Sequence, residues 1–307
     1  MDIQRTDFLS FNEELHEYKD PTGNLYESVS QFLGRFKTPF DEKKISFYMA
    51  KAKAGKGAAY KDVKTVQEEI LEGWEKKRDR SADYGTMIHE VVEFALRGKH
   101  IDYDEVRSAI ALKTGVMIDV QKLKTAIDIM LDDYFQYYKV VPELRVHNEK
   151  YRKAGTVDIP LQRTKSTKTK KAVVDIDDLK TNLERGIEFD SIKREAKAWV
   201  KHYDRFMLHP LSHLEQSNYQ VYCLQLSSYA YFIEQQYDVT IGRLAIRYID
   251  KNFNWYLYPV PYMRSTVIDM LEYSDNVLQL PMVSKPEIIS QPSLKPPRMF
   301  EGETSEF

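Results

Sequence analysis

Two aspartates and a lysine stand out in this chain because together they are suited to hydrolysing phosphodiester bonds. Asp158 closes the run Gly155-Thr156-Val157-Asp158, and Asp178 and Lys180 end a β-rich run that starts at Val173. If these runs are adjacent strands, the two carboxylates converge on one divalent cation and the ammonium lies beside them. A cation held in this way neutralises a scissile phosphate and lowers the pKa of an attacking water. Asp158, Asp178 and Lys180 are therefore the candidate catalytic core.

Strand alternation divides the acidic residues before Lys180 into two sets. Asp178 and Lys180 lie two residues apart and share one face of a strand, whereas Asp175 and Asp177 share the opposite face. We expect solvated or capping roles for Asp175 and Asp177, unless a β-bulge makes Asp177 a competitor for the metal. A purely structural salt pair between Asp178 and Lys180 is the alternative to catalysis.

The segment Gly85–Glu93 offers further ligands on a helix. Gly85, His89 and Glu93 are spaced four residues apart and lie on one helical face. His89 is a candidate metal ligand, Glu93 would bind the metal or orient His89 or a water, and Gly85 would allow a close approach to the sheet or a phosphate. A surface pair between His89 and Glu93 is the alternative. A zinc protease is not predicted, because Glu93 stands where its second histidine would be.

Two more groups of residues are candidates for contact with a nucleic acid. Tyr222, Gln225 and Tyr229 share a helical face, on which the tyrosines could be core residues while Gln225 requires hydrogen-bond partners. Between the two candidate strands, residues 163–171 contain five cations and no acid, as either a solvated loop or a phosphate-binding loop beside the site. The candidate DNA-binding residues of this loop are Arg163, Lys165, Lys168, Lys170 and Lys171.

In this order, the motifs resemble those of the RecB-like branch of the PD-(D/E)xK nuclease superfamily. Gly-x-x-x-His-x-x-x-Glu, Gly-Thr-x-Asp, Asp-x-Lys-Thr and Gln-x-x-x-Tyr follow one another here, and the run from His16 to Leu33 and Trp74 are similar too. The likeness covers roughly residues 15–260 and is strongest to phage-type and mitochondrial single-domain exonucleases. No Walker A frame is present, so an ATP-driven motor is not predicted.

The resemblance implies which residues hold a metal and which act around it. The implied ligands of Mg2+ or Mn2+ are His89, Asp158, Asp178 and the backbone carbonyl of Leu179. Glu93 would bind the metal directly or contact one of its ligands. Lys180 would orient the nucleophilic water or stabilise the pentavalent phosphate. Gln225 and Tyr229 would support the site and the DNA strand. Some relatives hold an iron–sulfur cluster with four cysteines, which a chain with Cys223 alone is not expected to bind.

Periodicity predicts an α/β fold in which a central mixed sheet is flanked by helices, which is also the core that the resemblance implies. We expect an N-terminal hairpin that turns at residues 20–24, a short helix from Ser28, and a mainly helical stretch from 42 to 139 in which one helix starts at Gly85. Expected strands are 144–150, 155–161, 172–178, 241–249 and 254–258, the last stopped by Pro259, and expected helices are about 183–207 and 220–236. The expected divisions are a hairpin and helical region 1–84, a nuclease core 85–283 with a helical insertion at 183–207, and a flexible proline-rich tail 284–307.

Composition limits the class of protein. The chain has 307 residues, of which 42% are hydrophobic and 30% charged, as in ordinary soluble globular proteins. Its net charge of −2 gives no global attraction to nucleic acid, so such binding needs local basic patches. A single cysteine excludes a disulfide framework, and we expect neither a signal peptide nor a membrane span, so the expected location is the cytoplasm. The resemblance implies that this is the cytoplasm of a bacterial or phage-infected cell.

The sequence thus predicts a Mg2+- or Mn2+-dependent deoxyribonuclease, in particular an exonuclease of DNA replication, recombination or repair. Its expected partner is DNA, single-stranded or with a duplex end, with a replication or recombination protein as a possible second partner. A structure-specific endonuclease and a non-cleaving DNA-binding module on the same fold are the two alternatives.

Overall fold

The computed structural model describes residues 1–6, 8–12, 17–55, 60–183, 186–189 and 206–279. Most of the helix expected at 183–207 and the whole tail from 284 lie outside these residues. None of the helices in the described ranges is long and apolar enough to span a membrane.

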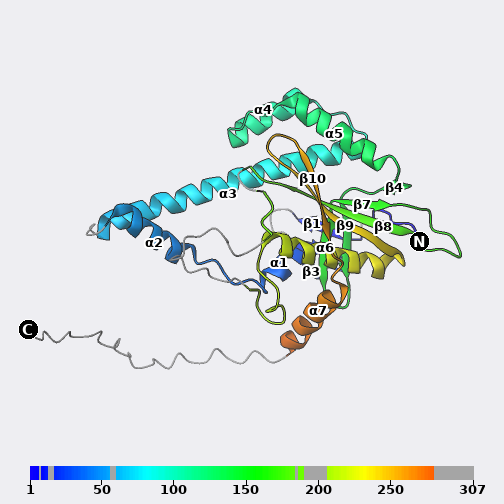
Figure 1. Ribbon diagram of the computed structural model, residues 1–307. Helices are drawn as coiled ribbons and strands as arrows, with labels where there is room; N and C mark the ends of the chain where they lie inside the picture. The colour runs from blue at the N-terminus through cyan, green and yellow to red at the C-terminus, as the bar shows by residue number, and fades with distance from the viewer. Residues whose placement is uncertain (7, 13–16, 56–59, 184–185, 190–205, 280–307) are drawn as a thin grey trace, which may run out of the picture.

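The described strands form two five-stranded sheets (Figure 1). The first sheet contains, in spatial order, β1 (Ser10–Asn12), β2 (Glu17–Lys19), β3 (Leu25–Ser28), β6 (Lys153–Val157) and β5 (Leu144–Asn148). The second contains β10 (Trp255–Val260), β9 (Thr240–Ile249), β8 (Val173–Thr181), β7 (Ile159–Gln162) and β4 (Lys139–Val140). Each sheet is mixed, because β3 pairs with β6 and β8 with β9 in parallel while the other pairs are antiparallel. The mixed α/β class is confirmed, with the strands in two sheets instead of one.

Asp158 is the single residue between β6 and β7, so one extended segment passes from the first sheet to the second at this position. Val157 and Ile159 on either side of it are fully buried. All residues of β6 and β7 except Thr156 are buried. The carboxylate of Asp158 therefore lies on a rigid part of the fold.

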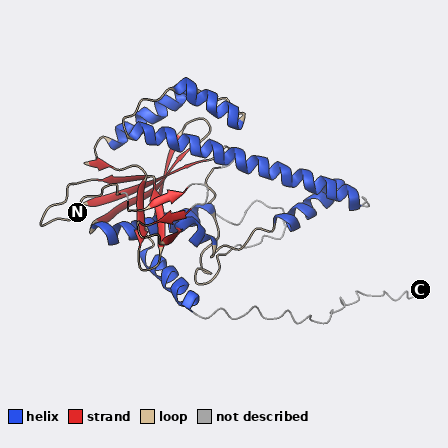
Figure 2. Cartoon of the chain, turned by 180° about the vertical axis from the view of Figure 1, so that it is seen from behind, coloured by secondary structure: helices blue, strands red, loops and turns tan. Residues whose placement is uncertain are grey.

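Helices cover both faces of the second sheet, and one of these two helical layers also packs on the first sheet (Figures 1 and 2). One layer contains α3 (Tyr60–Leu96), α4 (Tyr103–Thr114) and α5 (Val120–Tyr134), which share a hydrophobic core with Leu179 and Ile249. The other layer contains α1 (Val29–Gly34), α6 (Asn218–Tyr237) and α7 (Arg264–Gln279), whose core includes Ile176 and Ile246. Alternate residues of β8 thus face different layers: Asp175, Asp177 and Leu179 face α5, whereas Asp178 and Lys180 face α6.

The start of α3 differs from the prediction. A helix beginning at Gly85 was expected, but α3 begins at Tyr60 and runs through Gly85 for 37 residues, so the expected division between residues 84 and 85 falls inside it. Its N-terminal part packs on α2 (Glu42–Ala54) in an arm that projects away from the sheets (Figure 1). Ion pairs one turn apart, such as Lys76 with Glu72, support this exposed part of the helix. A glycine is tolerated within a helix whose other residues favour it.

Two smaller expectations have definite outcomes. The N-terminal hairpin turns where expected, because the Asp20 carboxylate accepts hydrogen bonds from the backbone amides of Thr22 and Asn24, each at 2.9 Å. Pro259 was expected to stop the last strand, but β10 continues through it to Val260. This is possible because β10 is the edge of its sheet, where a residue without an N–H leaves no neighbouring strand unpaired.

Candidate metal centre

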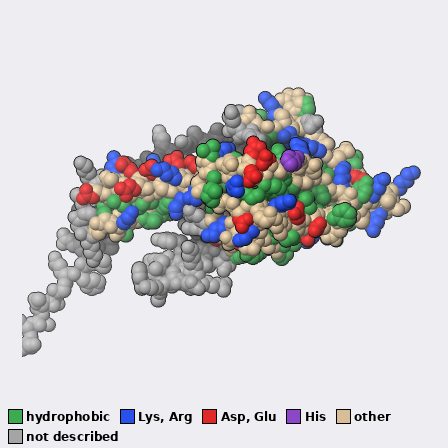
Figure 3. Space-filling model, turned by 90° about the horizontal axis from the view of Figure 1, so that it is seen from above, with side chains coloured by type: hydrophobic (Ala, Val, Ile, Leu, Met, Phe, Trp, Pro, Cys, Tyr) green, Lys and Arg blue, Asp and Glu red, His purple; other side chains and the backbone are tan. Residues whose placement is uncertain are grey.

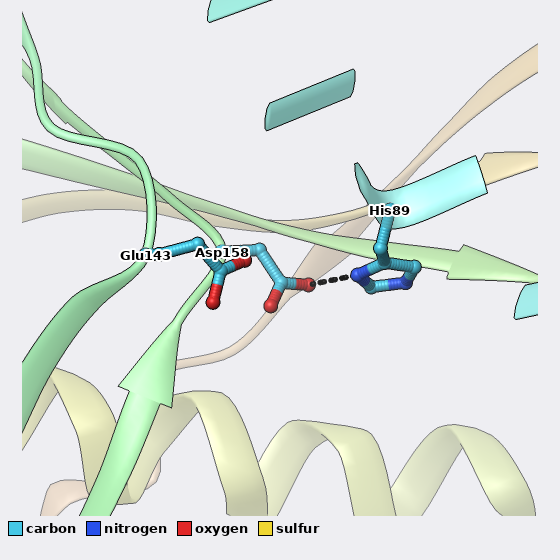
Figure 4. Close-up of side chains that lie close together, drawn as sticks. All are labelled: His89, Glu143 and Asp158. Atoms are coloured by element: carbon cyan, nitrogen blue, oxygen red, sulfur yellow. Dashed lines mark ion pairs between the residues drawn. The ribbon is translucent and has the colours of Figure 1, made fainter. Parts of the chain in front are cut away.

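Asp158 is placed by β8 and α3. Its Oδ2 accepts a hydrogen bond from the backbone amide of Leu179 at 2.8 Å and lies 3.7 Å from Nδ1 of His89 (Figure 4). The side chain is only 15% exposed, and burial raises its pKa, an effect that nearby Lys180 and the Leu179 hydrogen bond partly offset. The structure therefore brings the predicted His89 and Asp158 together.

Glu143 is a candidate ligand that the sequence analysis missed. One ligand atom from each of His89, Glu143 and Asp158 lies within 4.8 Å of the others, and Figure 4 shows the two carboxylates side by side. The Glu143 backbone amide donates to the carbonyl of Asp158 at 3.0 Å, and its φ of 56° is a conformation that side chains other than glycine seldom adopt. Burial, and then the charges of Asp158 and Glu93, raise the pKa of Glu143 to about 8.

The register of two paired strands would have identified Glu143. The antiparallel pairing of β5 with β6 sets Leu144 opposite Val157, so Glu143 comes opposite Asp158. Both strands were expected from the sequence, but their pairing was not, and no local pattern marks Glu143.

Asp178 and Lys180 complete the acidic group from β8. Asp178 is 1% exposed and forms an ion pair with Lys180, whose ammonium also lies 3.3 Å from the Leu179 carbonyl and 5.1 Å from the centre of the Tyr222 ring. Burial raises the pKa of Asp178 to about 6 even though Lys180 opposes the shift. Burial alone would lower the pKa of Lys180, but the two aspartates raise it well above its ordinary value, so the lysine stays charged.

His89 is held neutral. Burial and then the charge of Lys180 lower its pKa to about 4, so the imidazole is uncharged at neutral pH. A neutral imidazole has a lone pair for a metal, whereas a protonated one repels it. His89, Glu143 and Asp158 form the compact set of ligand atoms, and Asp178 is close enough for the charges of Asp158 and His89 to affect its pKa. We name these four residues the metal cluster.

The donors of the metal cluster fit a divalent cation. Carboxylate and carbonyl oxygens suit Mg2+ and Mn2+, and an imidazole nitrogen is accepted by Mn2+ and heavier metals. The backbone carbonyl of Leu179, which the resemblance implies as a ligand, also lies at the site. It accepts a hydrogen bond from Lys180, and its hydrogen bond with His89 slightly opposes the lowering of the His89 pKa. Acids this close and this buried are stabilised by a bound cation, which supports a metal centre here.

Glu93 lies one turn beyond His89 on α3 but is paired elsewhere. Its carboxylate is 2.5 Å from a guanidinium nitrogen of Arg97. Its charge contributes to the raised pKa of Glu143, so it is near the metal cluster without belonging to the compact set of ligand atoms.

Gln225 and Tyr229 form a support on α6. The Gln225 amide donates to the Tyr229 hydroxyl at 2.8 Å, and the charge of Asp178 adds to the effect of burial in raising the pKa of Tyr229. The Tyr229 ring lies directly on Gly155 of β6, where a Cβ atom would come within 2.3 Å of the ring. Gly155 therefore allows α6 to approach the strand that carries Asp158.

The basic loop 163–171 leaves the second sheet at the end away from Asp158. The last pair of β7 with β8 is Gln162 with Val174, four residues along from the metal cluster, or about 13 Å at the rise of a strand. Figure 3 shows a group of Lys and Arg side chains at the end of the molecule opposite the α2–α3 arm. Lys165, Lys168 and Lys170 are exposed, whereas Arg163 pairs with Asp175 and Lys171 with Asp238.

Of the solvated or capping roles expected for Asp175 and Asp177, the solvated one was wrong, because both residues are fully buried. Asp175 lies 2.8 Å from Arg163 Nε, and Asp177 lies 2.7 Å from Arg243 and 3.3 Å from Arg247. Each also accepts a hydrogen bond from a hydroxyl, Asp175 from Tyr137 and Asp177 from Tyr134, and the backbone amide of Arg243 donates to Asp175 at 2.7 Å. We name Asp175, Asp177 and these three arginines the arginine cluster. The β8 bulge, between Val174 and Ile176, lies before Asp177 and leaves it facing away from the metal cluster.

Comparisons with known proteins give distant structural likenesses only. No family model matches the chain, and no curated protein matches it. A crystal structure of a candidate exonuclease from Eubacterium rectale is similar over 82% of this chain and 79% of its own, with 13% identity and a TM-score of 0.39. The crystal structure of SSO0001 is similar over 58% of this chain and 68% of its own, with 12% identity and a TM-score of 0.24. At these TM-scores the likenesses carry no argument about function.

Proposed function

We propose that this chain is a divalent-metal-dependent nuclease that hydrolyses phosphodiester bonds in DNA. The observation that carries the proposal is the metal cluster, in which burial raises the pKa values of Glu143, Asp158 and Asp178. Holding several carboxylates together in this way costs stability unless a cation compensates them, and such an arrangement is typical of a functional site.

The residues around the cluster have complementary roles in this proposal. When bound, Mg2+ or Mn2+ would neutralise the scissile phosphate and make an adjacent water more acidic. His89, Asp158, Asp178 and Glu143 would hold the cation. Lys180 stays charged and is fixed between Asp178 and the Leu179 carbonyl, so its ammonium can orient the water and stabilise the negative charge that develops on the phosphate.

An exonuclease acting on DNA ends is the form that we infer, with DNA replication, recombination or repair as its setting. The order of the motifs around His89, Asp158, Asp178 and Lys180 supports this form of the proposal. The exposed lysines of the 163–171 loop would contact backbone phosphates away from the reaction centre. A loop some distance from the site suits binding of a strand that extends beyond the cleaved bond.

The experiment is digestion of end-labelled linear DNA, single- and double-stranded, beside covalently closed circles and matched RNA. Each substrate is incubated with Mg2+, Mn2+ or EDTA, and Lys180→Ala is the inactive control. We expect metal-dependent loss of linear DNA, and a decrease of about 100- to 1000-fold in Lys180→Ala, as for removal of one donor to a developing charge. Cleavage of circles would instead indicate the endonuclease. No cleavage with either metal, while the protein still binds DNA, would support the alternative of a non-cleaving DNA-binding module.

A further inference from the structure

The sheet face that carries Asp178 and Lys180 continues into a group of tyrosines at the sheet edge. Across the second sheet, Lys180 pairs with Tyr248, and Tyr248 pairs with Tyr256. One step along the strands, Asp178 pairs with Ile246, and Ile246 pairs with Tyr258. Residues directly opposite one another in a sheet point to the same face, so these tyrosines and the candidate catalytic residues share one surface.

We name Tyr248, Tyr256 and Tyr258 the tyrosine row. Their ring centres are 6.1 to 6.4 Å apart, and the rings of Tyr256 and Tyr258 are inclined by only 12°. Adjacent strands are about 4.8 Å apart, so Tyr256 is two strands, or about 10 Å, from Lys180. The row is therefore within the reach of a nucleotide next to one bound at the metal cluster.

Exposure increases from the cluster toward the edge. Tyr248 is 6% exposed, Tyr258 is half-buried and Tyr256 is 43% exposed. The Tyr256 hydroxyl donates to Asp250 at 3.4 Å, and the ring of Phe189 lies at an angle to Tyr258 with centres 5.2 Å apart. The rings are thus oriented by neighbours, but the outermost one is left accessible to a ligand.

From this geometry we propose that Tyr256 and Tyr258 form a base-stacking subsite for a nucleic-acid strand whose phosphodiester lies at the metal cluster. The inference rests on the proposed nuclease function and identifies the form of substrate. Aromatic rings stack on unpaired bases of any sequence, whereas the bases of an intact duplex stack on one another and expose only their edges. The subsite therefore selects a strand that is single or frayed next to the cleaved bond.

Leu257 supplies a matched control. It lies between the two tyrosines, is 46% exposed and, by strand alternation, points to the opposite face. Replacing Tyr256 or Leu257 with alanine removes a similarly exposed apolar side chain from the same edge strand, but only the first change touches the proposed subsite.

The test is fluorescence anisotropy of labelled oligonucleotides with the full chain in EDTA, where cleavage is suppressed. We expect Tyr256→Ala to weaken binding of oligo-dT by roughly 5- to 150-fold, the range found for loss of one base–aromatic stack, and Leu257→Ala to change it less than about twofold. Tyr256→Phe should bind as the wild type, because it keeps the ring. An abasic oligonucleotide of equal length should bind equally to the wild type and Tyr256→Ala.

Several outcomes would overturn the subsite. These are equal effects of Tyr256→Ala and Leu257→Ala, a loss in Tyr256→Phe as large as in Tyr256→Ala, or a loss that persists with the abasic strand. Quenching of Tyr256→Trp fluorescence by oligo-dT, but not by the abasic strand, is an independent measurement that does not depend on the alanine variant. A wild type that neither binds nor cleaves DNA would refute the nuclease proposal itself, whereas a wild type that cleaves but is insensitive to Tyr256→Ala would refute only the subsite.

Discussion

Strand β8 contributes acids to two buried clusters that differ in what compensates them. In the arginine cluster, Asp175 and Asp177 are paired with Arg163, Arg243 and Arg247 and also accept tyrosine hydroxyls. In the metal cluster, Lys180 is paired with Asp178, while burial raises the pKa values of all three carboxylates. Burial alone therefore does not mark a functional acid. The distinction is whether the protein itself provides enough positive charge.

The largest expected effect separates the clusters by activity. Asp178→Asn should decrease cleavage by more than about 1000-fold, since it removes a ligand as well as a charge, which is more than the loss of one transition-state donor. The same change should leave the melting temperature of the metal-free protein unchanged or higher, because it removes a buried charge while Asp158 still compensates Lys180. The measurements are single-turnover cleavage and thermal unfolding in EDTA. A strongly destabilised Asp178→Asn protein would show that Asp178 is structural.

The reciprocal change is in the arginine cluster. Asp177→Asn should lower the free energy of unfolding by at most about 3–5 kcal/mol, the cost of breaking a buried ion pair, because Arg243 and the buried Arg247 both lose this carboxylate and only Asp133 remains paired with Arg247. Binding of Mn2+ by the folded variant, measured by calorimetry below its melting temperature, should equal that of the wild type. A loss of Mn2+ affinity without a loss of stability would contradict the assignment of the two clusters.

A third difference is in pH dependence without metal. A carboxyl whose pKa is raised on folding favours the folded state when it is protonated, so its contribution is present below the unfolded pKa and is lost as pH rises through the folded value. For Asp178 the loss should occur from about pH 4 to about pH 6, and for Glu143 from about pH 4.5 to about pH 8.

Thermal unfolding in EDTA should therefore show the wild type losing stability relative to Asp178→Asn between pH 4 and pH 6, by at most about 3 kcal/mol for a shift of this size. Saturating Mg2+ should reduce this loss, because the bound cation favours the ionised acids. Parallel pH profiles of the two proteins in EDTA would show that the pKa of Asp178 is not raised.

The smallest expected effect concerns Glu143. Glu143→Gln should weaken Mn2+ binding by about 10- to 100-fold, the range for residues at or just beyond a ligand shell. Glu90→Gln on α3 is a control that removes a carboxylate outside the metal cluster. Equal Mn2+ affinities of Glu143→Gln and the wild type would remove Glu143 from the site.

Local patterns and long-range pairing were not equally predictable from the sequence. The structure brings His89, Asp158, Asp178 and Lys180 together as their ordered motifs suggested, and most of the core strands and α6 lie close to their expected bounds. Glu143 could not be found because its place depends on the register of β5 with β6. The burial of Asp175 and Asp177 could not be found because the arginines that compensate their charges lie up to about 70 positions away in the sequence, as Arg247 does from Asp177. Gly85 was misjudged because the helix around it is supported by neighbours that outweigh one glycine.

The position of Asp158 between the two sheets has a consequence for when the site forms. Strands β6 and β7 belong to different sheets, His89 comes from a helix on one face, and Asp178 comes from a strand that follows later in the chain. A partly synthesised or partly folded chain therefore has the individual side chains but not their convergence. The proposed nuclease activity would therefore arise only when folding is complete. A nascent chain would not hydrolyse nucleic acids before that point.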